Sequence, residues 1–418
     1  MAYTKSVRYF LTIVLLFACA IVTLDQSIQA QSAISGVSTP ASAIPQPGDA
    51  GVRAHTFLRV LGSGGPVAGT PAAVGPPFSG YFYETPASLA CVYELTGYPS
   101  GPCNPNTTFD NPTGGSNAIA IVDAYDYPGA SADLAHFAAQ FGVTFNPSAF
   151  HVVYAPAGDP TGPLGTCKGP ATAVRPPGAA AYGWDLEEAL DIQWSHSMAP
   201  GATVYLVEAQ SNYDVDLYCG VRTAAALVAA QGGGEISMSW GHGEYAGELS
   251  ADSTFVQDSV VFFASSGDSG SVSYPSASPN VVSVGGTAVS RNASSGAFQR
   301  EVAWQDAGGG ISAYEPVPNY QRRTYQVPSV VGAYRGTPDV SAVASTDTGV
   351  WVYLNGGWYV VGGTSVASPV VAGIVNAAGT FAKSSSAELT LIYSNIQDTG
   401  YLRGFYDIQI GTCGAYVS

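Results

Sequence analysis

A serine that follows two glycines is the strongest local indication of chemistry in this chain. Residues 362–369 read GGTSVASP and lead from an apolar segment into an apolar helical pattern at residues 366–377. Glycine lets the backbone turn sharply, and the positive end of the following helix favours negative charge near Ser365. Ser365 is therefore a candidate nucleophile, although an ordinary helix start capped by Ser or Thr explains the same residues.

A second indication is the acidic stretch DLEEALD at residues 185–191. On a helix, Glu187 and Asp191 share a face, where two like charges are unfavourable unless they share a proton or a partner. A shared proton raises one pKa and gives an acid–base pair that works at low pH. Asp185 and Glu188 are explained as an N-cap and its capping-box partner. Glu187 and Asp191 therefore remain as the candidates for acid–base catalysis.

A third candidate is Asp268, which stands in the stretch SSGDSG directly after the apolar run at residues 260–264. Small residues at the carboxyl end of a buried strand mark the rim of a site in open α/β sheets. A protonated aspartic acid donates a hydrogen bond to an oxyanion, which again indicates acid pH. The alternative is an ordinary turn.

The elements that must position these side chains are short apolar strands that alternate with helical patterns. Strands that are apolar throughout suit a parallel sheet covered on both faces, and the alternation favours an α/β layered domain. Residues 350–361 are typical of a hairpin with Asn355-Gly356 as its turn. The expected strands are residues 118–123, 203–209, 235–240, 260–264 and 281–284, and the expected helices are 131–141 and 215–231.

Composition excludes several classes of function. The chain has 418 residues, with 30 acidic and 14 basic ones, and its formal net charge of −16 argues against nucleic acid or an anionic membrane as partner. Hydrophobic residues make up 46% and charged residues 11%, which supplies a core and argues against disorder of the whole chain. The sequence has no HExxH, CxxC or phosphate-binding glycine loop, so zinc and nucleotide chemistry have no support.

The N-terminus is predicted to be a signal peptide over residues 1–30. Lys5 and Arg8 precede an apolar run at residues 10–22, and the stretch SIQA ends at a typical cleavage position. The run is shorter than the about 20 residues of a membrane-spanning helix, so we expect cleavage, secretion and no membrane contact afterwards. Residues 31–77 are rich in Ala, Gly, Pro and Ser and are predicted to be a linker or short pro-segment without a core of its own.

The cysteines of an exported chain can form disulfides. Cys91 with Cys103 closes a short loop, and Cys167 with Cys219 is the expected second bridge, although the sequence alone does not determine the pairing. Cys413 is left over, either free or paired with a residue beyond this sequence.

Together these segments resemble the sedolisins, the serine-carboxyl peptidases. GGTSVASP is similar to their nucleophile motif GTSxAxP, EEALD to their ExxLD helix and SSGDSG to their SGDSG segment, in the right order over residues 78–418. The resemblance implies a three-layer α/β/α, subtilisin-like fold with a mainly parallel sheet of about seven strands. It also implies polypeptide substrates and a monomer, secreted and acting at acid pH.

The resemblance assigns a role to each candidate residue. Ser365 would attack the peptide carbonyl, Glu187 would take its proton and return it to the leaving amine, and Asp191 would orient Glu187. Asp268 would stabilise the tetrahedral oxyanion. A carboxylate base stays functional at a pH where imidazole is already protonated, which explains operation in acid.

The resemblance further implies a Ca²⁺ site near the C-terminus, built from an Asp-Ile pair, glycine carbonyls and a later Asp. Asp407 and Ile408 match the first part of that site, and no later Asp follows, so we expect a partial site in a C-terminally truncated domain. The family's long pro-domain has only residues 31–77 as a counterpart here, which leaves the route of activation open.

Three other interpretations compete with this one. A Ser/His/Asp subtilase would combine Asp123 with Ser365, but it needs a histidine at a helix start, and none of the five histidines fits. A glycosidase with two carboxylates explains Glu187 and Asp191 but leaves GGTSVASP without a role. An inactive secreted binding module on a peptidase fold is the third, and a test for hydrolysis of a denatured protein at acid pH separates it from the enzyme.

Overall fold

The computed structural model describes most of the chain after the expected signal peptide, which itself lies outside the described residues. These are residues 35–68, 75–78, 80–96, 101–168, 174–395, 405–408, 410–413 and 416–417.

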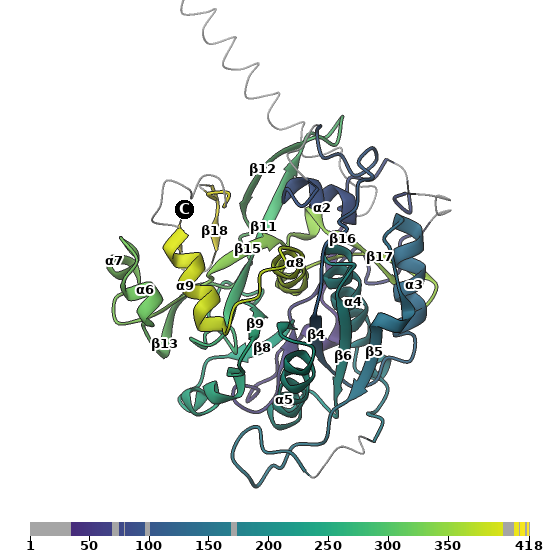
Figure 1. Cartoon of the computed structure of the whole chain (residues 1–418). Coiled ribbons are helices and arrows are strands. Elements are labelled where there is room, and N and C mark those ends of the chain that lie inside the picture. Colours follow the sequence, from purple (N-terminus) through teal and green to yellow (C-terminus); the bar gives the residue numbers. More distant parts are fainter. Residues whose placement is uncertain are drawn as a thin grey trace, which may run out of the picture.

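A central sheet forms the middle layer of the molecule (Figure 1). Its strand order is β12-β11-β9-β7-β4-β6-β5, with β15 also paired to β11, which makes eight strands within the described residues. Only the β11–β12 pairing is antiparallel among them, so the prediction of a mainly parallel sheet is confirmed. The strands are β4 (Ala118–Ala124), β5 (Phe150–Tyr154), β6 (Thr203–Ala209), β7 (Gly234–Met238), β9 (Val260–Ser265), β11 (Val282–Arg291), β12 (Phe298–Ala303) and β15 (Val340–Val343).

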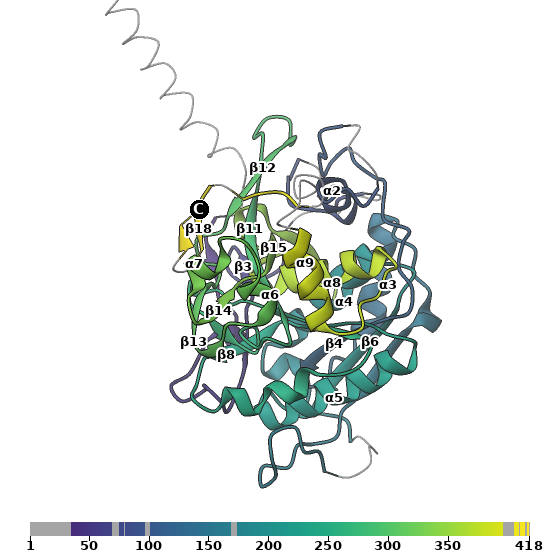
Figure 2. The same cartoon turned by 60° about the vertical axis from the view of Figure 1, so that its left-hand side comes forward.

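Helices cover both faces of this sheet, as Figure 2 shows with α5 below it and α3, α4 and α8 above it. Alternate residues of β4 point to opposite faces. Ile119 and Ile121 belong to the hydrophobic cluster that includes α3, α4 and α8, whereas Ala120 and Val122 belong to the cluster with α5. The fold is therefore the predicted three-layer α/β/α arrangement. The α-helices are α2 (Pro86–Val92), α3 (Ala130–Phe141), α4 (Asp185–Met198), α5 (Asp214–Ala230), α6 (Asn319–Arg322), α7 (Val327–Val331), α8 (Thr364–Ala377) and α9 (Ser385–Asn395).

Within the part of the chain that the structure describes, four small sheets accompany the central one. They comprise β1 (Val37–Ser38), β3 (Arg59–Leu61), β17 (Gly357–Gly362) and β16 (Val350–Leu354); β10 (Ser273–Tyr274), β8 (Trp240–Gly243) and β2 (His55–Thr56); β13 (Gly310–Pro316) and β14 (Tyr334–Thr337); and β18 (Thr412–Cys413) and β19 (Tyr416–Val417). Short 3-10 helices occur at Ala41–Ala43, Pro147–Ala149, Ala179–Ala181, Glu248–Ser250, Asp252–Phe255 and Thr346–Thr348. The predicted hairpin is β16–β17, and its turn residues Asn355 and Gly356 both have positive φ.

Part of the segment that we expected to be a linker or short pro-segment belongs to the folded domain. β2 pairs with β8, and β3 pairs with β17 through Val60 opposite Val361. Leu58 is fully buried and, with Val60, belongs to the main hydrophobic cluster. Residues 54–61 of the expected linker or short pro-segment are therefore packed against the rest of the domain. These few apolar residues stand among Gly and Pro, so their pattern is too short to predict burial.

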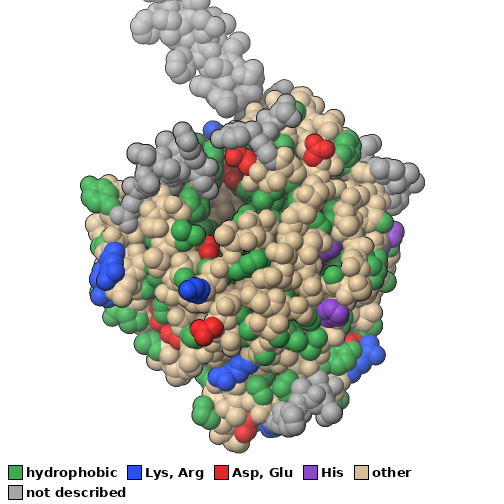
Figure 3. All heavy atoms as spheres, in the orientation of Figure 1, with side chains coloured by type: hydrophobic (Ala, Val, Ile, Leu, Met, Phe, Trp, Pro, Cys, Tyr) green, Lys and Arg blue, Asp and Glu red, His purple; other side chains and the backbone are tan. Residues whose placement is uncertain are grey.

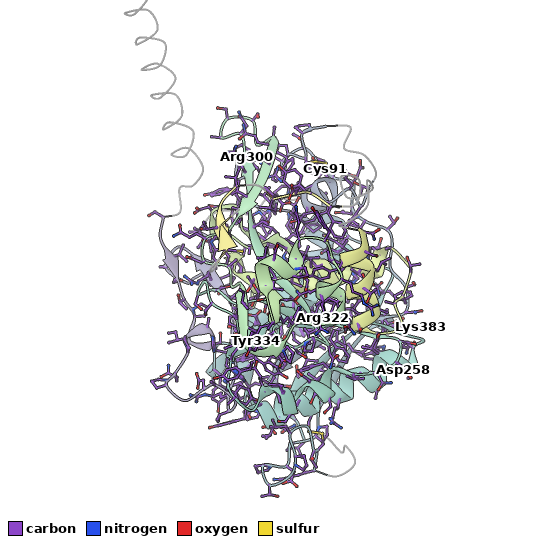
Figure 4. The ribbon with its side chains drawn as sticks, turned by 90° about the vertical axis from the view of Figure 1, so that its left-hand side faces the viewer. Cys91, Asp258, Arg300, Arg322, Tyr334 and Lys383 are labelled. Carbon is purple, nitrogen blue, oxygen red and sulfur yellow. A yellow bond between two sulfur atoms is a disulfide. The ribbon has the colours of Figure 1, made fainter. Side chains whose placement is uncertain are left out.

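Both expected disulfides form, and they join Cys91 to Cys103 and Cys167 to Cys219. Cys91 is labelled in Figure 4, on α2. Cys413 is half-buried and makes no disulfide within the described part of the chain. No helix among the described residues is both long and apolar enough to span a membrane.

Few charged side chains lie on the surface, as Figure 3 shows for one face of the molecule. In Figure 4 the labelled basic side chains Arg300, Arg322 and Lys383 lie apart from one another. This arrangement agrees with the low fraction of charged residues, 11% of the chain.

Candidate active site

Ser365 stands in the first turn of α8, directly after β17 and the two glycines. Gly363 is the N-cap of α8 and has a φ of +107°, which side chains rarely tolerate. A β-carbon at Gly363 would also lie 2.0 Å from the carbonyl oxygen of Phe57. The predicted strand–glycine–helix arrangement is confirmed, and Ser365 is fully buried.

The hydroxyl of Ser365 is held by two backbone groups. It donates to the carbonyl oxygen of Ser239 at 3.1 Å and accepts from the backbone N–H of Phe57 at 3.1 Å. Ser239 interrupts the expected strand 235–240, because β7 ends at Met238 and β8 begins at Trp240. Its own hydroxyl donates to Asp191 Oδ1 at 2.9 Å. Ser239 therefore connects Ser365 to α4, and nothing in the sequence pattern indicated this.

Glu187 and Asp191 lie on α4 as predicted, and both are fully buried. Burial and then the nearby Asp123 raise the pKa of Glu187 well above its ordinary value, while the hydroxyls of Ser365 and Thr56 oppose the rise. Burial, Asp123 and Glu187 likewise raise the pKa of Asp191, and Ser239 opposes. The structure thus places both carboxyls around the candidate nucleophile in an environment that favours their protonated forms.

Asp123 is a third buried carboxyl at this site, near the carboxyl end of β4. Burial, and then Glu208, raise the pKa of Asp123 to about 8. The sequence suggested Asp123 only as a member of a Ser/His/Asp triad. Its position at a strand end could have indicated instead that Asp123 belongs to the cluster of buried acidic side chains, because the carboxyl ends of parallel strands line sites in α/β sheets.

Asp268 follows β9 and faces the start of α8. Its Oδ1 accepts from the backbone N–H of Thr364 at 2.8 Å and from the Thr364 hydroxyl at 2.9 Å. Its Oδ2 lies 3.8 Å from Arg59 Nε. Burial raises the pKa of Asp268 to about 7, against the opposing effects of Thr364 and Arg59. Asp268 is therefore protonated in acid and has a donor available next to Ser365.

The expected capping box at Asp185 and Glu188 is wrong. Trp184 is the N-cap of α4 without a side-chain cap, and Asp185 Oδ1 accepts from the adjacent backbone N–H of Leu186 at 3.1 Å. Because the helix begins at Asp185, Glu188 lies one residue beyond the third helical position, whose side chain would complete a capping box. Glu188 is instead fully buried, and burial and then Glu208 raise its pKa well above the ordinary value.

Two of the histidines pair with groups other than the nucleophile. His136 stacks on Tyr353 with ring centroids 3.9 Å apart, and His196 Nε2 contacts the carbonyl oxygen of Thr144 at 3.0 Å. No histidine nitrogen bonds to the Ser365 hydroxyl within the residues that the structure describes. The structure therefore does not support the Ser/His/Asp alternative.

The expected calcium residues form no more than part of a site. Asp407 is exposed and Ile408 is half-buried. Across the described ranges, no group of three or more His, Cys, Asp or Glu side chains is placed to hold a metal ion. Ca²⁺ prefers six or more oxygen ligands, at about 2.3–2.6 Å, so these two residues do not suffice alone.

Comparison with known proteins agrees with this geometry. A family model described as the subtilase family matches residues 178–390. Kumamolisin from Bacillus sp. (strain MN-32) is 31% identical over 295 residues, which cover 63% of this chain and 48% of that protein. Sedolisin from Pseudomonas sp. (strain 101) is 38% identical over 118 residues, 26% of this chain and 19% of that protein. The chain thus spans about half the length of kumamolisin and less of sedolisin.

Among solved structures, one similar chain is Pseudomonas sedolisin, a serine-carboxyl proteinase, complexed with two molecules of pseudo-iodotyrostatin. The TM-score is 0.59 at 23% identity, over 80% of this chain and 90% of that one, which shows a shared fold. The chain therefore belongs to the subtilase family, and it is similar to kumamolisin and sedolisin.

Proposed function

We propose that this protein is a secreted, acid-acting serine-carboxyl endopeptidase that hydrolyses peptide bonds through an acyl-enzyme on Ser365. The observation that carries the proposal is the convergence of buried carboxyls on one serine hydroxyl. Glu187 neighbours Ser365 directly, Asp191 reaches it through Ser239, and Asp268 flanks the start of its helix. Buried ionisable groups around a potential nucleophile are typical of catalytic sites.

In the proposed reaction, Ser365, Glu187 and Asp268 each have a separate role. The Ser365 hydroxyl turns from the Ser239 carbonyl to Glu187, transfers its proton there and attacks the peptide carbonyl carbon. The backbone N–H of Ser365 and the protonated carboxyl of Asp268 donate to the oxygen that becomes negative. Glu187 then returns the proton to the leaving amine, and water hydrolyses the acyl ester in the second half of the reaction.

Acid operation follows from the protonation that this mechanism needs. Asp268 donates only while it is neutral, and its pKa is about 7. Glu187 must be ionised in part of the enzyme to act as a base, although its surroundings raise its pKa. The requirement on Asp268 restricts activity to the acid side of neutrality, and interacting carboxyls that share a proton keep one of the pair ionised there.

Secretion is part of the proposal and is supported by the signal-peptide pattern over residues 1–30 and by the two disulfides. Polypeptides are the proposed substrates and a monomer the proposed state. For calcium, Asp407 and the carbonyl of Ile408 would supply oxygen ligands, and further oxygen ligands would be needed to complete the site. No step of the reaction depends on the ion.

Hydrolysis of a denatured protein such as casein at about pH 4, near the ordinary carboxyl pKa values, tests the proposal. The wild type should release peptides, and Ser365→Ala should release none. Ser368→Ala is a matched control, because Ser368 is equally buried on α8 but pairs with Ser237 at 2.8 Å. The control should keep the wild-type rate. Binding of casein without any hydrolysis would favour the inactive binding module instead.

A further inference from the structure

A pair of buried glutamates joins α4, the helix that carries Glu187 and Asp191, to strand β6 of the central sheet. Glu188 lies on α4 and Glu208 lies near the carboxyl end of β6, and both are fully buried. The proposed reaction uses neither of them. Because a buried carboxyl is costly unless it is neutral or hydrogen-bonded, the burial of this pair requires a physical explanation.

The sheet points the side chain of Glu208 toward α4. Alternate residues of a strand point to opposite faces, and Leu206 of β6 belongs to the hydrophobic cluster that includes α4. Glu208 therefore points to the same face as Leu206. Its neighbour in register on β4 is Asp123, which carries a further buried carboxyl. The carboxyls of Glu188 and Glu208 form a hydrogen bond with each other on this face.

The hydrogen bond between the two carboxyls requires a proton. Both oxygens of Glu188 and Oε2 of Glu208 have no other hydrogen-bond partner within the described part of the chain. Oε1 of Glu208 accepts from the backbone N–H of Tyr127 at 3.0 Å, which favours Glu208 as the acceptor of the pair. Two ionised carboxylates are acceptors only, and they would repel each other. The contact between α4 and β6 at this point therefore depends on a proton that Glu188 donates.

The surroundings of the pair are mostly acidic. Arg175 is the cation among the groups that act on it, but Arg175 donates to Asp126 Oδ2 at 2.7 Å and its side chain is 57% exposed. An exposed cation with a partner of its own compensates only part of the cost of a buried negative charge. The charged and titratable groups around the pair are Asp185, Glu187 and Asp191 of α4, Asp123 of β4, Asp126 and Tyr127 after β4, Tyr154 of β5, and Arg175.

The closed structure binds the protons of this pair more tightly than water does. Burial raises the pKa of Glu208 from 4.5 to about 7, although the N–H of Tyr127 opposes the rise. Burial, and then Glu208, raise the pKa of Glu188 well above its ordinary value. A local opening that brings water to the pair returns both groups to their ordinary pKa values. The open state then binds fewer protons, so opening becomes more favourable as the pH rises.

We propose that the Glu188–Glu208 pair holds α4 on the sheet by a shared proton, and that α4 opens locally more often as the protein is brought from acid to neutral pH. The inference rests on the proposed function in one respect, since α4 carries the proposed base, and it adds control by pH to that function. Each opening separates Glu187 from Ser365, so fewer molecules have an assembled site at neutral pH. Return to acid restores the shared proton, so the change is reversible.

The test is hydrogen–deuterium exchange of the full chain at about pH 4 and about pH 7.5, read by mass spectrometry on peptides from residues 185–198 and corrected for the effect of pH on intrinsic amide exchange. Glu208→Gln keeps an acceptor for Glu188 but cannot ionise. At about pH 4 this variant should match the wild type. At about pH 7.5 its α4 should exchange about a hundredfold more slowly than that of the wild type, because each pKa unit between 4.5 and about 7 is a tenfold change.

Glu235→Gln is the matched control. Glu235 is also fully buried, and burial raises its pKa to about 8, but it lies on β7 and accepts from Asn376 of α8 at 2.7 Å. This variant should leave the exchange of α4 as it is in the wild type. Equal slowing of α4 exchange in both variants would show global instead of local opening. Wild-type exchange in Glu208→Gln at about pH 7.5 would show that the pair does not hold α4. Either result overturns the inference.

Hydrolysis of casein at about pH 4 by the same samples separates this inference from the proposed function. The wild type and Glu208→Gln should hydrolyse casein at the same rate. Casein hydrolysis without any difference in exchange would overturn the role of the pair and leave the proposed function standing. If no sample cut casein but α4 exchanged as expected, the proposed function would fail and the pH-dependent opening of α4 would stand.

Discussion

The hydroxyl of Ser239 donates a hydrogen bond to Asp191 Oδ1 at 2.9 Å, while the carbonyl of the same serine accepts from the hydroxyl of Ser365 at 3.1 Å. One residue between β7 and β8 therefore contacts both the proposed nucleophile and the carboxyl that orients its base. Its hydroxyl also opposes the rise in the pKa of Asp191. In the proposed mechanism, Ser239 is therefore a positioning residue.

Removal of this hydroxyl should slow catalysis without abolishing it. A hydrogen bond to a charged group contributes about 1.5–3 kcal/mol, so Ser239→Ala should lower kcat by about ten- to a hundredfold with little change in KM. Its pH profile should also shift to higher pH, because the pKa of Asp191 rises. Ser237→Ala, at a buried serine that bonds Ser368 instead, is the control. Equal kinetics of the two variants would show that Ser239 has no special role.

The two neighbouring glutamates should respond in different ways to the same substitution. Glu187→Gln should lose several orders of magnitude in kcat at about pH 4, because the serine has no base. Glu188→Gln should stay active, since Glu188 lies beside Glu208 and its pKa is raised, so that an amide replaces an acid that is already neutral. Steady-state kinetics of both variants check this. An inactive Glu188→Gln with an active Glu187→Gln would reverse the assignment.

Asp268 should determine the alkaline limit of activity. Its pKa is about 7, so the wild type should lose its oxyanion donor as the pH rises through that value. Asp268→Ala should cost about 10²–10³ in kcat, as for other oxyanion-hole donors. Asp268→Asn keeps an N–H donor at every pH and should retain part of the activity with a flatter alkaline limb. An unchanged alkaline limb in Asp268→Asn would show that another group sets the limit.

Stability should fall as the pH rises from acid toward neutrality. Burial raises the pKa of Asp268 and Glu208 to about 7 and that of Asp123 to about 8. The folded state therefore binds more protons than the unfolded chain, whose carboxyls titrate near about pH 4, and the free energy of unfolding declines between these values. Thermal unfolding from about pH 4 to about pH 8 should show a steadily falling Tm. A Tm that rose over this range would contradict the buried protonated carboxyls.

Local patterns in the sequence predicted much of the central sheet and of the helices that carry the candidate site residues. The buried strands of the sheet are continuous apolar runs, so β4, β6 and β9 match their expected positions within about a residue or two, the usual uncertainty of element ends. The two glycines before Ser365 and the spacing of Glu187 and Asp191 on a helix are likewise local features. They could be recognised without any knowledge of what packs against them.

Features that depend on tertiary contacts were missed. Ser239 is one of many serines, and only the break between β7 and β8 turns it toward both Asp191 and Ser365. Glu188 is buried near Glu208 of β6, a neighbour that is distant in the sequence, whereas the residues next to Glu188 in the sequence favoured a cap. Phe57 contacts Ser365 across 308 positions of the chain, within a segment whose glycines and prolines resemble a linker.

The covalent intermediate is the most direct test of the account. Wild-type protein mixed with a peptide substrate at about pH 4 and quenched in strong acid should carry an acyl group, located by mass spectrometry on Ser365. The same adduct should be absent from Ser365→Ala, which should also hydrolyse nothing. An adduct on another residue, or hydrolysis that persists in Ser365→Ala at the wild-type rate, would contradict the assignment of Ser365 as the nucleophile.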